Sequence, residues 1–401
     1  MKILYTNASS QLGGAERNLI DVISAVQKQD PSIEITVLIT ALDGPLVAEL
    51  TPLGVKIILL ELPRKIARFG DSGLKRGNKT ANVFKLVTGL PVVELVRYWW
   101  QLRQTIKAID PDLIHSNGFK THLLVSSLGT SIPIIWHLHD FISSRLAIGK
   151  ILKFFSSQVT VAIAISQAVA QDWETLFPHL QIELIYNAID TEKYRSLKSE
   201  LNNVESPLKI GLVATYALWK GHDIFIQAIG QIARQHPALK STVQFYIIGG
   251  AIYETEKSQY SRSGLQQLAA DLKVEDWLHF IDFQSDIVSS YNMLDIVVHA
   301  STNPEPFGRT IVEAMACEKA VIVSSAGGAA ELFTHNRDAI GVTPGDPVML
   351  AAAIEDLIAN PATRLAIGKA GRSTAIARFA LDRLGTDLLL LYRNIIRSQR
   401  Q

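Results

Sequence analysis

Two glutamates eight positions apart mark the segment of this chain best suited to chemistry. Glu305 and Glu313 enclose the sequence Glu-Pro-Phe-Gly-Arg-Thr-Ile-Val-Glu, which follows the apolar run IVVHAST. Because proline is tolerated at the first position of a helix, we expect a helix over 307–317. The first N–H groups of a helix lack intrahelical partners and, with the helix dipole, form an anion site. The groups expected to bind an anion are the backbone N–H groups of Phe307, Gly308, Arg309 and Thr310.

The second glutamate has its own place on that helix. Helical side chains tilt toward the N-terminus, so the Glu313 carboxylate is expected to reach back toward a ligand held there. Phe307, Ile311 and Ala314 form the apolar stripe expected to face the core. Glu313 is expected to lie outside that stripe. The alternative is a helix whose acidic residues only complement its dipole, each worth about 0.3–1 kcal/mol.

Lys220 is the candidate cation for the same ligand. It lies between the apolar run LKIGLVA and a helical pattern that starts near His222, which predicts a position at the carboxyl end of a strand. An ammonium about 4 Å from a phosphate oxygen gains on the order of 4 kcal/mol at an effective dielectric constant of 20. The alternative is a surface lysine that caps a turn.

Polar side chains also close two apolar runs of the amino-terminal half. His115 ends the run DLIH with Asn117 close behind, and the next run ends in His137 and His139. We expect both runs to end at the ligand edge of a sheet. We expect alternation along the strand to turn His137 to the face opposite His139, where a lone histidine is more often structural. We expect His115, Asn117 and His137 to line this edge together with Gly13.

Two weaker signals bear on cofactors and metals. Gly13 and Gly14 lack the spacing of a dinucleotide fingerprint, but adjacent glycines at a helix start let a ligand approach the backbone closely. Asp110 and Asp112 have an Asp-x-Asp spacing, yet they precede the run DLIH at its amino end and indicate a turn. No zinc-site spacing of histidines or cysteines occurs. We therefore expect chemistry that needs no metal ion and no bound cofactor.

Short β-branched runs alternate with amphipathic stretches along the chain, which is typical of parallel sheets covered by helices. The first half predicts strands at 2–6, 33–40, 55–61, 113–115, 133–138 and 159–165, with helices at 14–29, 91–109 and 166–177. The pattern restarts after a polar stretch at 191–207. The second half predicts strands at 208–214, 243–249, 296–300 and 320–324, with helices at 221–235, 257–273, 307–317 and 347–378.

These segments together resemble a known family. The stretch from Glu305 to Glu313 is similar to the Glu-x7-Glu motif of retaining GT-B glycosyltransferases, particularly family 4. Further segments resemble motifs of this family in its order: GGAE at 13–16, KGH at 220–222 and Gly-Gly-x-x-Glu at 327–331. Between the first two, Ile-Tyr-Asn-Ala-Ile-Asp at 185–190 is similar to the family's Asn-Gly-Val-Asp segment at the domain junction. The resemblance covers nearly the whole chain.

The resemblance implies a GT-B fold, an α/β architecture of two Rossmann-like domains facing each other across a cleft. An acceptor-binding domain over 1–190 would precede a nucleotide-sugar-binding domain over 191–380, and a helix over 381–401 would pack back on the first domain. The implied enzyme is a retaining hexosyltransferase that moves a sugar from a nucleotide diphosphate donor to a hydroxyl group of a glycan, lipid-linked or small-molecule acceptor. The alternatives are a nucleotide-sugar epimerase or phosphorylase of the same fold and a non-catalytic nucleotide-sugar sensor.

The resemblance also implies residue roles. Glu305 would hold the donor sugar and Glu313 the ribose hydroxyl groups. His139 would stabilise the sugar in the transition state, and Lys220 would bind the donor's phosphates. The candidate catalytic residues are therefore His139, Glu305 and Lys220. Gly14, at the start of a helix, would also touch the phosphates. The residues on the acceptor side would be Gly13, His115, Asn117 and His137.

Thr215 departs from the family pattern. It stands where relatives often have an arginine that supplies a second positive charge to the phosphates. A hydroxyl group donates one hydrogen bond but brings no charge. Helix N-termini or Arg309 would then supply the remaining neutralisation, or the donor would bind more weakly.

Composition and charge bound the partners and the setting. Thirty-nine Lys and Arg against 38 Asp and Glu give a net charge of +1, which argues against a nucleic acid partner. The single cysteine, Cys317, and the lack of a signal-peptide pattern in MKILYTNASS predict a cytoplasmic location. The stretch 64–107 differs, because it has ten basic and two acidic residues together with five aromatic ones. It suits either the anionic inner face of a membrane or a solvated helix face.

Overall fold

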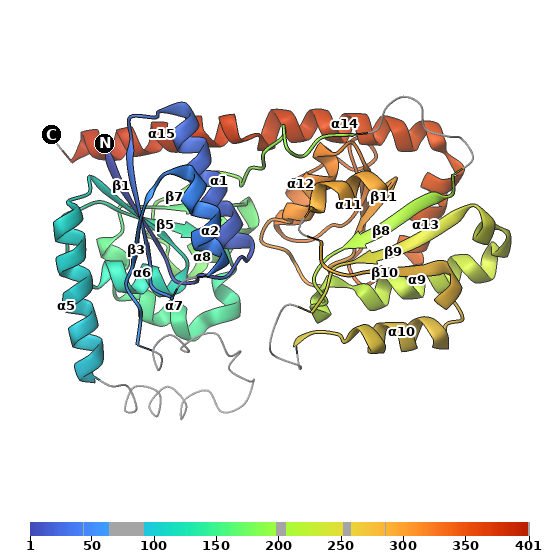
Figure 1. Cartoon of the computed structure of the whole chain (residues 1–401), viewed down its shortest axis with the longest axis horizontal. Helices are drawn as coiled ribbons and strands as arrows, with labels where there is room; N and C mark the ends of the chain where they lie inside the picture. Colours follow the sequence, from blue (N-terminus) through green and yellow to red (C-terminus); the bar gives the residue numbers. More distant parts are fainter. Residues whose placement is uncertain (43, 64–91, 198–205, 252–257, 285, 400–401) are drawn as a thin grey trace. The chain divides into compact units, whose positions relative to one another are not determined.

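The computed structural model describes residues 1–42, 44–63, 92–197, 206–251, 258–284 and 286–399. The chain forms two compact units (Figure 1). One consists of residues 1–186 together with 382–401, and the other of residues 187–381. The boundary after Tyr186 lies close to the one expected after Asp190, and the last helix is grouped with the first unit.

The first unit is built on a parallel sheet of seven strands in the order β3-β2-β1-β4-β5-β6-β7. Its strands are β1 (Lys2–Asn7), β2 (Glu34–Ile39), β3 (Lys56–Leu59), β4 (Leu113–Asn117), β5 (Ile134–Leu138), β6 (Val161–Ala164) and β7 (Ile182–Leu184). Its helices are α1 (Gly14–Gln29), α2 (Pro45–Leu50), α5 (Val92–Ile109), α6 (Phe119–Ser126), α7 (Leu146–Lys153), α8 (Gln167–Leu176) and α15 (Leu381–Ser398). The sequence did not predict the short elements β7, α2, α6 and α7.

The second unit has a parallel sheet of six strands in the order β10-β9-β8-β11-β12-β13. Its strands are β8 (Leu208–Val213), β9 (Val243–Ile248), β10 (Leu278–Ile281), β11 (Ile296–His299), β12 (Ala320–Ser324) and β13 (Ile340–Val342). Its helices are α9 (His222–Gln235), α10 (Arg262–Asp271), α11 (Ile287–Met293), α12 (Arg309–Ala316), α13 (Pro347–Ala359) and α14 (Pro361–Phe379). The helix expected over 347–378 is two helices, because Pro361 keeps the preceding Asn360 out of helical geometry.

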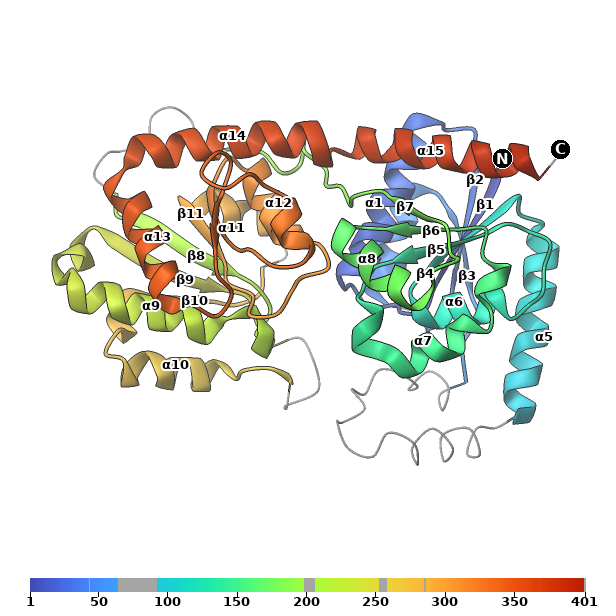
Figure 2. The ribbon, with the colours of Figure 1, turned by 180° about the vertical axis from the view of Figure 1, so that it is seen from behind.

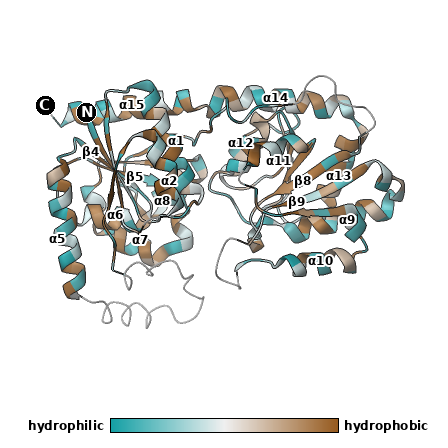
Figure 3. Ribbon diagram, in the orientation of Figure 1, coloured by the Kyte–Doolittle hydropathy of each residue, from teal (hydrophilic) through white to brown (hydrophobic). Residues whose placement is uncertain are grey.

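Helices cover the sheets of both units, so the central strands are buried over most of their length (Figures 2 and 3). Every residue of β5 is buried, for example. In the first unit α15 lies beside α1, where Lys28 pairs with Asp382 at 2.7 Å and Arg393 pairs with Asp30 at 2.8 Å. This contact buries Tyr392, which lies on the apolar stripe of α15.

Each sheet has one place where the strand order reverses. It lies between β1 and β4 in the first unit and between β8 and β11 in the second. Ligands of open α/β sheets bind beyond the carboxyl ends of the strands at such a switch point. Most of the residues singled out in the sequence follow these four strands directly.

Candidate functional site

Lys220 and Glu305 form an ion pair at the switch point of the second unit. The distance from Nζ of Lys220 to Oε1 of Glu305 is 2.6 Å. Lys220 ends the turn after β8, and Glu305 lies in the loop after β11. The two side chains are only 24% and 11% exposed, so solvent screens their attraction less than at an open surface. The structure thus brings the predicted cation and the predicted carboxylate together.

Gly221 lets the turn that carries Lys220 approach β11 closely. Its φ of +71° is left-handed, and a Cβ atom there would lie 1.9 Å from the carbonyl oxygen of Ala300. The backbone N–H of Thr302 donates to the carbonyl of Trp219 at 2.8 Å and joins the same two loops. A glycine is therefore needed at 221 to hold Lys220 beside the loop that follows β11.

Two further side chains surround the Glu305 carboxylate. The Ser301 hydroxyl donates to Oε1 of Glu305 at 2.6 Å, and Nε2 of His299 lies 3.6 Å from the same oxygen. Burial raises the pKa of Glu305, but the Lys220 ammonium and the His299 ring outweigh it and hold the pKa well below its usual range. Glu305 is therefore ionised at neutral pH.

The glycine pair at 327–328 fixes the backbone of Glu305. The N–H of Gly328 donates to the Glu305 carbonyl at 2.7 Å, and Gly327 forms a parallel bridge with Glu305. Gly327 has a φ of +62°, and a Cβ atom there would lie 2.6 Å from the Glu305 carbonyl oxygen. Gly327 and Gly328 therefore hold the backbone of Glu305 in position.

Helix α12 begins later than expected. Its first residue is Arg309, because Gly308 adopts a left-handed conformation with a φ of +101°. Glu305 accordingly lies in the loop before the helix rather than at its start. The Phe307 side chain is buried and packs edge-on against Phe379, with ring centroids 5.9 Å apart. The first turn of α12 starts at Arg309, and in it the N–H of Ile311 donates to the carbonyl of Gly308 at 3.0 Å.

Glu313 lies deeper than expected. It is buried, with Oε2 accepting from the Tyr291 hydroxyl at 2.9 Å and Oε1 accepting from Nε of Arg309 at 2.7 Å. The prediction that this side of the helix avoids the core is wrong, because every residue from Ile311 to Ala316 is buried. The carboxylate keeps lone pairs that can accept further hydrogen bonds.

Three other candidates of the second unit are partly exposed. Arg309 and Thr310 occupy the first turn of α12, and Thr215 follows β8. Arg309 is held on Glu313. It would have to leave this contact to supply the charge that Thr215 lacks.

In the first unit Asn7 and Asn117 join the strand ends at the switch point. Nδ2 of Asn117 donates to Oδ1 of Asn7 at 2.7 Å and to the carbonyl of Ala15 at 3.3 Å. Oδ1 of Asn117 lies 2.5 Å from Nε2 of His139, which follows β5. Burial lowers the pKa of His139 to about 3, so its ring is neutral at physiological pH.

Glu16 connects the loop at 13–16 to the same network. It accepts from the N–H of Gly13 at 3.1 Å and from Nδ2 of Asn7 at 3.4 Å. Burial raises the pKa of Glu16, and these hydrogen bonds offset part of the effect. Among the described residues, no atom outside the neighbouring backbone lies within 4 Å of where a Cβ of Gly14 would be. The start of α1 is therefore open to a ligand.

Two expectations about histidines are wrong. His137 lies on the same face of β5 as His139, with ring centroids 4.3 Å apart, because side chains two positions apart on a strand point the same way. His115 does not line an open surface. It is fully buried and hydrogen-bonded to Tyr392 of α15 and to His137.

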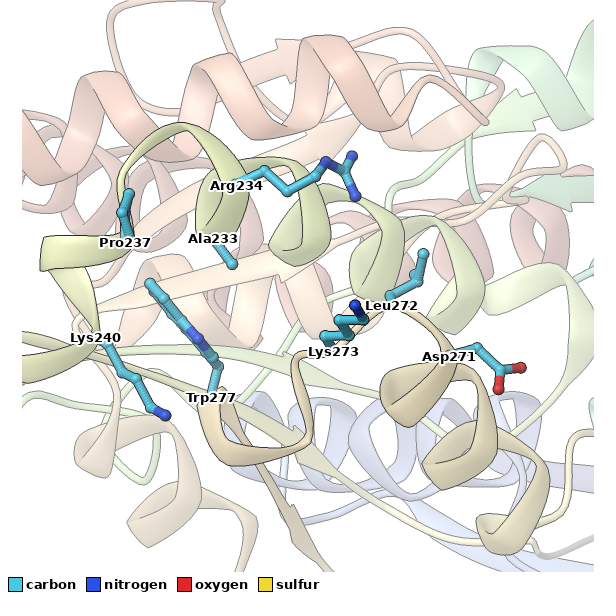
Figure 4. Close-up of a pocket in the computed structure, with 8 residues that line it drawn as sticks. All are labelled: Ala233, Arg234, Pro237, Lys240, Asp271, Leu272, Lys273 and Trp277. Carbon is cyan, nitrogen blue, oxygen red and sulfur yellow. The ribbon is translucent and has the colours of Figure 1, made fainter.

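Two features lie away from these sites. Asp112 accepts a hydrogen bond from the N–H of Lys2 at 2.8 Å, so the Asp-Pro-Asp turn is at the amino edge of the first sheet. A hollow of about 480 Å³ in the second unit is lined by Arg234 and Trp277, among others (Figure 4). It lies at the end of α9 remote from Lys220, and the 14 residues of this helix span about 21 Å.

The basic stretch at 64–107 is described only in part, since residues 64–91 lie outside the described residues. Its remainder forms α5, which exposes the apolar side chains of Val93, Val96 and Trp100 on one face. Trp99 instead donates through Nε1 to the carbonyl of Ser127. No helix within the described ranges is long and apolar enough to cross a membrane.

Two protein families match the sequence of this chain. Residues 194–374 match the family of glycosyl transferases group 1, and residues 12–193 match glycosyltransferase family 4. The chain belongs to the family 4 glycosyltransferases. Among solved structures, HepE from Anabaena, in complex with UDP and glucose, is 26% identical with a TM-score of 0.76. The match covers 98% of this chain and 99% of that one and confirms the GT-B fold.

Curated relatives of this family 4 chain match over part of their length. Spore coat protein SA of Bacillus subtilis is 27% identical over 252 residues, which cover 58% of this chain and 65% of the relative. Alpha-maltose-1-phosphate synthase of Mycobacterium tuberculosis is 27% identical over 244 residues, which cover 58% of this chain and 62% of the relative. The matched region thus spans less than two thirds of either relative.

Sequence reasoning missed several polar residues of these family 4 sites. Asn7 and His299 each close an apolar run at a switch point, a signal that was available in KILYTN and IVVH. Ser301 follows β11 directly and could have been found in the same way. Tyr291, on α11, shows no such signal, because only the packing of α11 against α12 brings it to Glu313.

Proposed function

We propose that this protein transfers a hexose from a nucleotide diphosphate donor to a hydroxyl group of an acceptor, with retention of the anomeric configuration. The observation that carries the proposal is the shielded ion pair of Lys220 and Glu305, in the loops that lead into α9 and α12. A cation and a helix N-terminus suit a leaving diphosphate, and a fixed carboxylate suits sugar hydroxyl groups. Membership in family 4 and the UDP complex of HepE support the same donor class.

In the proposed reaction the bond between the anomeric carbon and the diphosphate oxygen breaks. Lys220 and the first turn of α12 neutralise the charge that develops on the diphosphate. The leaving diphosphate takes the proton of the acceptor hydroxyl, which attacks from the same face, and the configuration is therefore retained. This proton transfer needs no protein base.

Glu305 is assigned to binding rather than to proton transfer. Its pKa is held well below the usual range, and a carboxylate of such low basicity is a poor general base. Its oxygens suit hydroxyl groups of the donor sugar, which can donate to them. Glu313 is assigned to the ribose hydroxyl groups, and His139 to the sugar at the transition state.

The proposal needs no metal ion or cofactor, since Lys220 and the helix N–H groups supply the neutralisation. Transfer measured with and without EDTA should proceed at the same rate. Loss of transfer that Mg²⁺ or Mn²⁺ restores would contradict this part of the proposal.

Product analysis tests the function. Wild-type protein is incubated with UDP-, GDP- and ADP-sugars and a set of hydroxyl acceptors, beginning with UDP-glucose because HepE was solved with UDP and glucose. We expect a glycoside with the donor's anomeric configuration, and a rate two to three decades lower for Lys220→Ala. Lys240→Ala is the matched control, because Lys240 pairs with Asp276 near the other end of α9. Unchanged turnover of Lys220→Ala would refute the role of Lys220.

The same assay separates the alternatives. An epimerase would return a rearranged sugar nucleotide, and a phosphorylase would require free phosphate. A sensor would bind the donor without turnover. If the wild type hydrolyses the donor in the absence of an acceptor and Glu305→Ala does not, the protein is not a non-catalytic sensor.

We also propose that the protein acts in the cytoplasm and associates with the anionic inner face of a membrane through α5 and the basic stretch before it. The exposed Val93, Val96 and Trp100 would enter the interface beside basic side chains. Sedimentation with phosphatidylserine vesicles should fall as salt rises and should weaken in Trp100→Ser. Leu390→Ser is the control, since Leu390 is 62% exposed on α15. Absence of binding at low salt would exclude this association.

A further inference from the structure

A line of hydrogen bonds runs through the buried interior of the first unit from α15 to the end of β5. The hydroxyl oxygens of Tyr5 and Tyr392 lie 3.2 Å apart, and the Tyr392 hydroxyl lies 2.7 Å from Nδ1 of His115. Nε2 of His115 lies 3.0 Å from Nδ1 of His137. None of these four side chains is more than 2% exposed. The line ends against the ring of His139.

The histidines of this line are neutral, so the position of each ring proton matters. Burial lowers the pKa of His115 to about 3 and lowers the pKa of His137 well below its usual value. A neutral imidazole has one N–H donor and one bare nitrogen. His115 is hydrogen-bonded through both ring nitrogens, so it donates on one side and accepts on the other. The hydrogen bonds of the line therefore all point either toward β5 or away from it.

The buried hydroxyl groups of Tyr5 and Tyr392 show which direction the line takes. Its hydroxyl is fully buried, and within the described parts of the chain Tyr392 is its hydrogen-bond partner. If the line donated away from β5, Tyr392 would donate to Tyr5, and the Tyr5 hydroxyl proton would have no acceptor, which is strongly unfavourable for a buried group. If the line donates toward β5, every proton inside the line has an acceptor, and only the Nε2 proton of His137, at the end of the line, is left for a ligand. His137 then carries its proton on Nε2.

Asn117 orients the neighbouring ring of His139. Nδ2 of Asn117 donates to the backbone carbonyl of Ala15 and to Oδ1 of Asn7. The side chain of Asn7 is oriented in turn by its own donation to the carbonyl of Ser9 at 2.7 Å. Oδ1 of Asn117 therefore accepts the Nε2 proton of His139. The neutral ring of His139 is left with a bare Nδ1.

We propose that Tyr392 is a positioning residue that holds His137 as the Nε2–H tautomer, so that His137 and His139 offer one donor and one acceptor to a hydroxyl group of the substrate. Among the described residues no partner occupies Nε2 of His137 or Nδ1 of His139. The substrate side of this inference rests on the proposed function, in which His139 contacts the donor sugar. The tautomer itself does not depend on that function.

Nitrogen-15 NMR of histidine-labelled protein tests the tautomers directly, because protonated and bare ring nitrogens differ widely in chemical shift. We expect Nε2–H signals for His115, His137 and His139 in the wild type. Tyr392→Phe removes the donor to Nδ1 of His115 and should give a mixture of tautomers at His115 and His137. Tyr5→Phe is the matched control, because Tyr392 still donates to His115. An Nδ1–H tautomer of His137 in the wild type would overturn the proposal, as would an unchanged spectrum in Tyr392→Phe.

Kinetics test the substrate side with the same pair of variants. We expect Tyr392→Phe to lower kcat/KM for the donor about tenfold, and Tyr5→Phe to change it less than twofold, although each variant loses one buried hydroxyl group. A changed tautomer with unchanged kinetics would overturn the role of His137 toward the substrate. If the wild type transfers no sugar, the proposed function fails while the NMR result still decides the direction of the line.

Discussion

Replacing Lys220 with methionine removes the ammonium from the ion pair and keeps most of the side-chain length. Removing one partner of a buried pair costs about 3–5 kcal/mol, because the remaining charge is left uncompensated. Here the Lys220 side chain is 24% exposed, and Glu305 still accepts from Ser301. We therefore expect the free energy of unfolding of the second unit to fall by about 2 kcal/mol at pH 7.

The pH dependence of this loss follows from the lowered pKa of Glu305. A carboxylate whose pKa is lower in the folded state stabilises that state above its unfolded pKa, about 4.3, and the stabilisation is lost as the pH falls through the folded-state pKa. In Lys220→Met, burial raises the pKa of Glu305 instead, and protonation relieves the unpaired charge. The difference in stability between wild type and variant should thus be largest at pH 6–7, be clearly smaller at pH 4, and continue to shrink below it.

Urea unfolding with hydrogen exchange of peptides from β8 and β11 measures the stability of the second unit separately. The double variant Lys220→Met/Glu305→Gln completes a cycle, and we expect a coupling energy of about 1–2 kcal/mol at pH 7. A coupling energy below about 0.5 kcal/mol, or a loss of stability that is the same at pH 4 and pH 7, would refute the reasoning.

Two further changes test how the loops are built. Gly221→Ala should destabilise the second unit by more than about 3 kcal/mol, because its Cβ would meet the Ala300 carbonyl. Gly345→Ala is the control, also at a positive φ of +76° but with no atom of the described residues within 4 Å of its Cβ, and should cost about 1 kcal/mol. Equal melting temperatures of the two variants would refute this explanation. Asp346→Ala removes the N-cap of α13, whose carboxylate accepts from the N–H groups of Val348 and Met349, and should cost about 1 kcal/mol in urea unfolding, with Asp346→Asn retaining most of the stability.

The sheets and long helices were predictable from the sequence, because parallel strands buried on both faces are read as continuous β-branched runs. The short strands β7, β10 and β13 were missed, since runs of three or four residues carry little periodicity. The meeting of Lys220 and Glu305 was also predictable, because each follows a strand at a switch point. The late start of α12 was not, since it depends on the left-handed conformation of Gly308.

The first unit shows why the rest of the site needed the structure. Tyr392 lies 277 positions from His115 in sequence, and only the packing of α15 brings their side chains together. The burial of Glu313 likewise depends on α11, which packs Tyr291 against it. The misplacement of His137 had a different origin, because the two-residue period of a strand already puts it on the same face as His139.

The central claim is that the Lys220 region binds the diphosphate of a nucleotide. Isothermal titration of the wild type, Lys220→Met and Lys240→Met with UDP, GDP and ADP, each compared with its nucleoside, tests it most directly. We expect at least one diphosphate to bind far more tightly than its nucleoside. In Lys220→Met this preference should fall at least tenfold, which corresponds to about 1.4 kcal/mol. Lys240→Met should leave the preference unchanged. Binding of no diphosphate, or equal binding to the wild type and Lys220→Met, would contradict the claim.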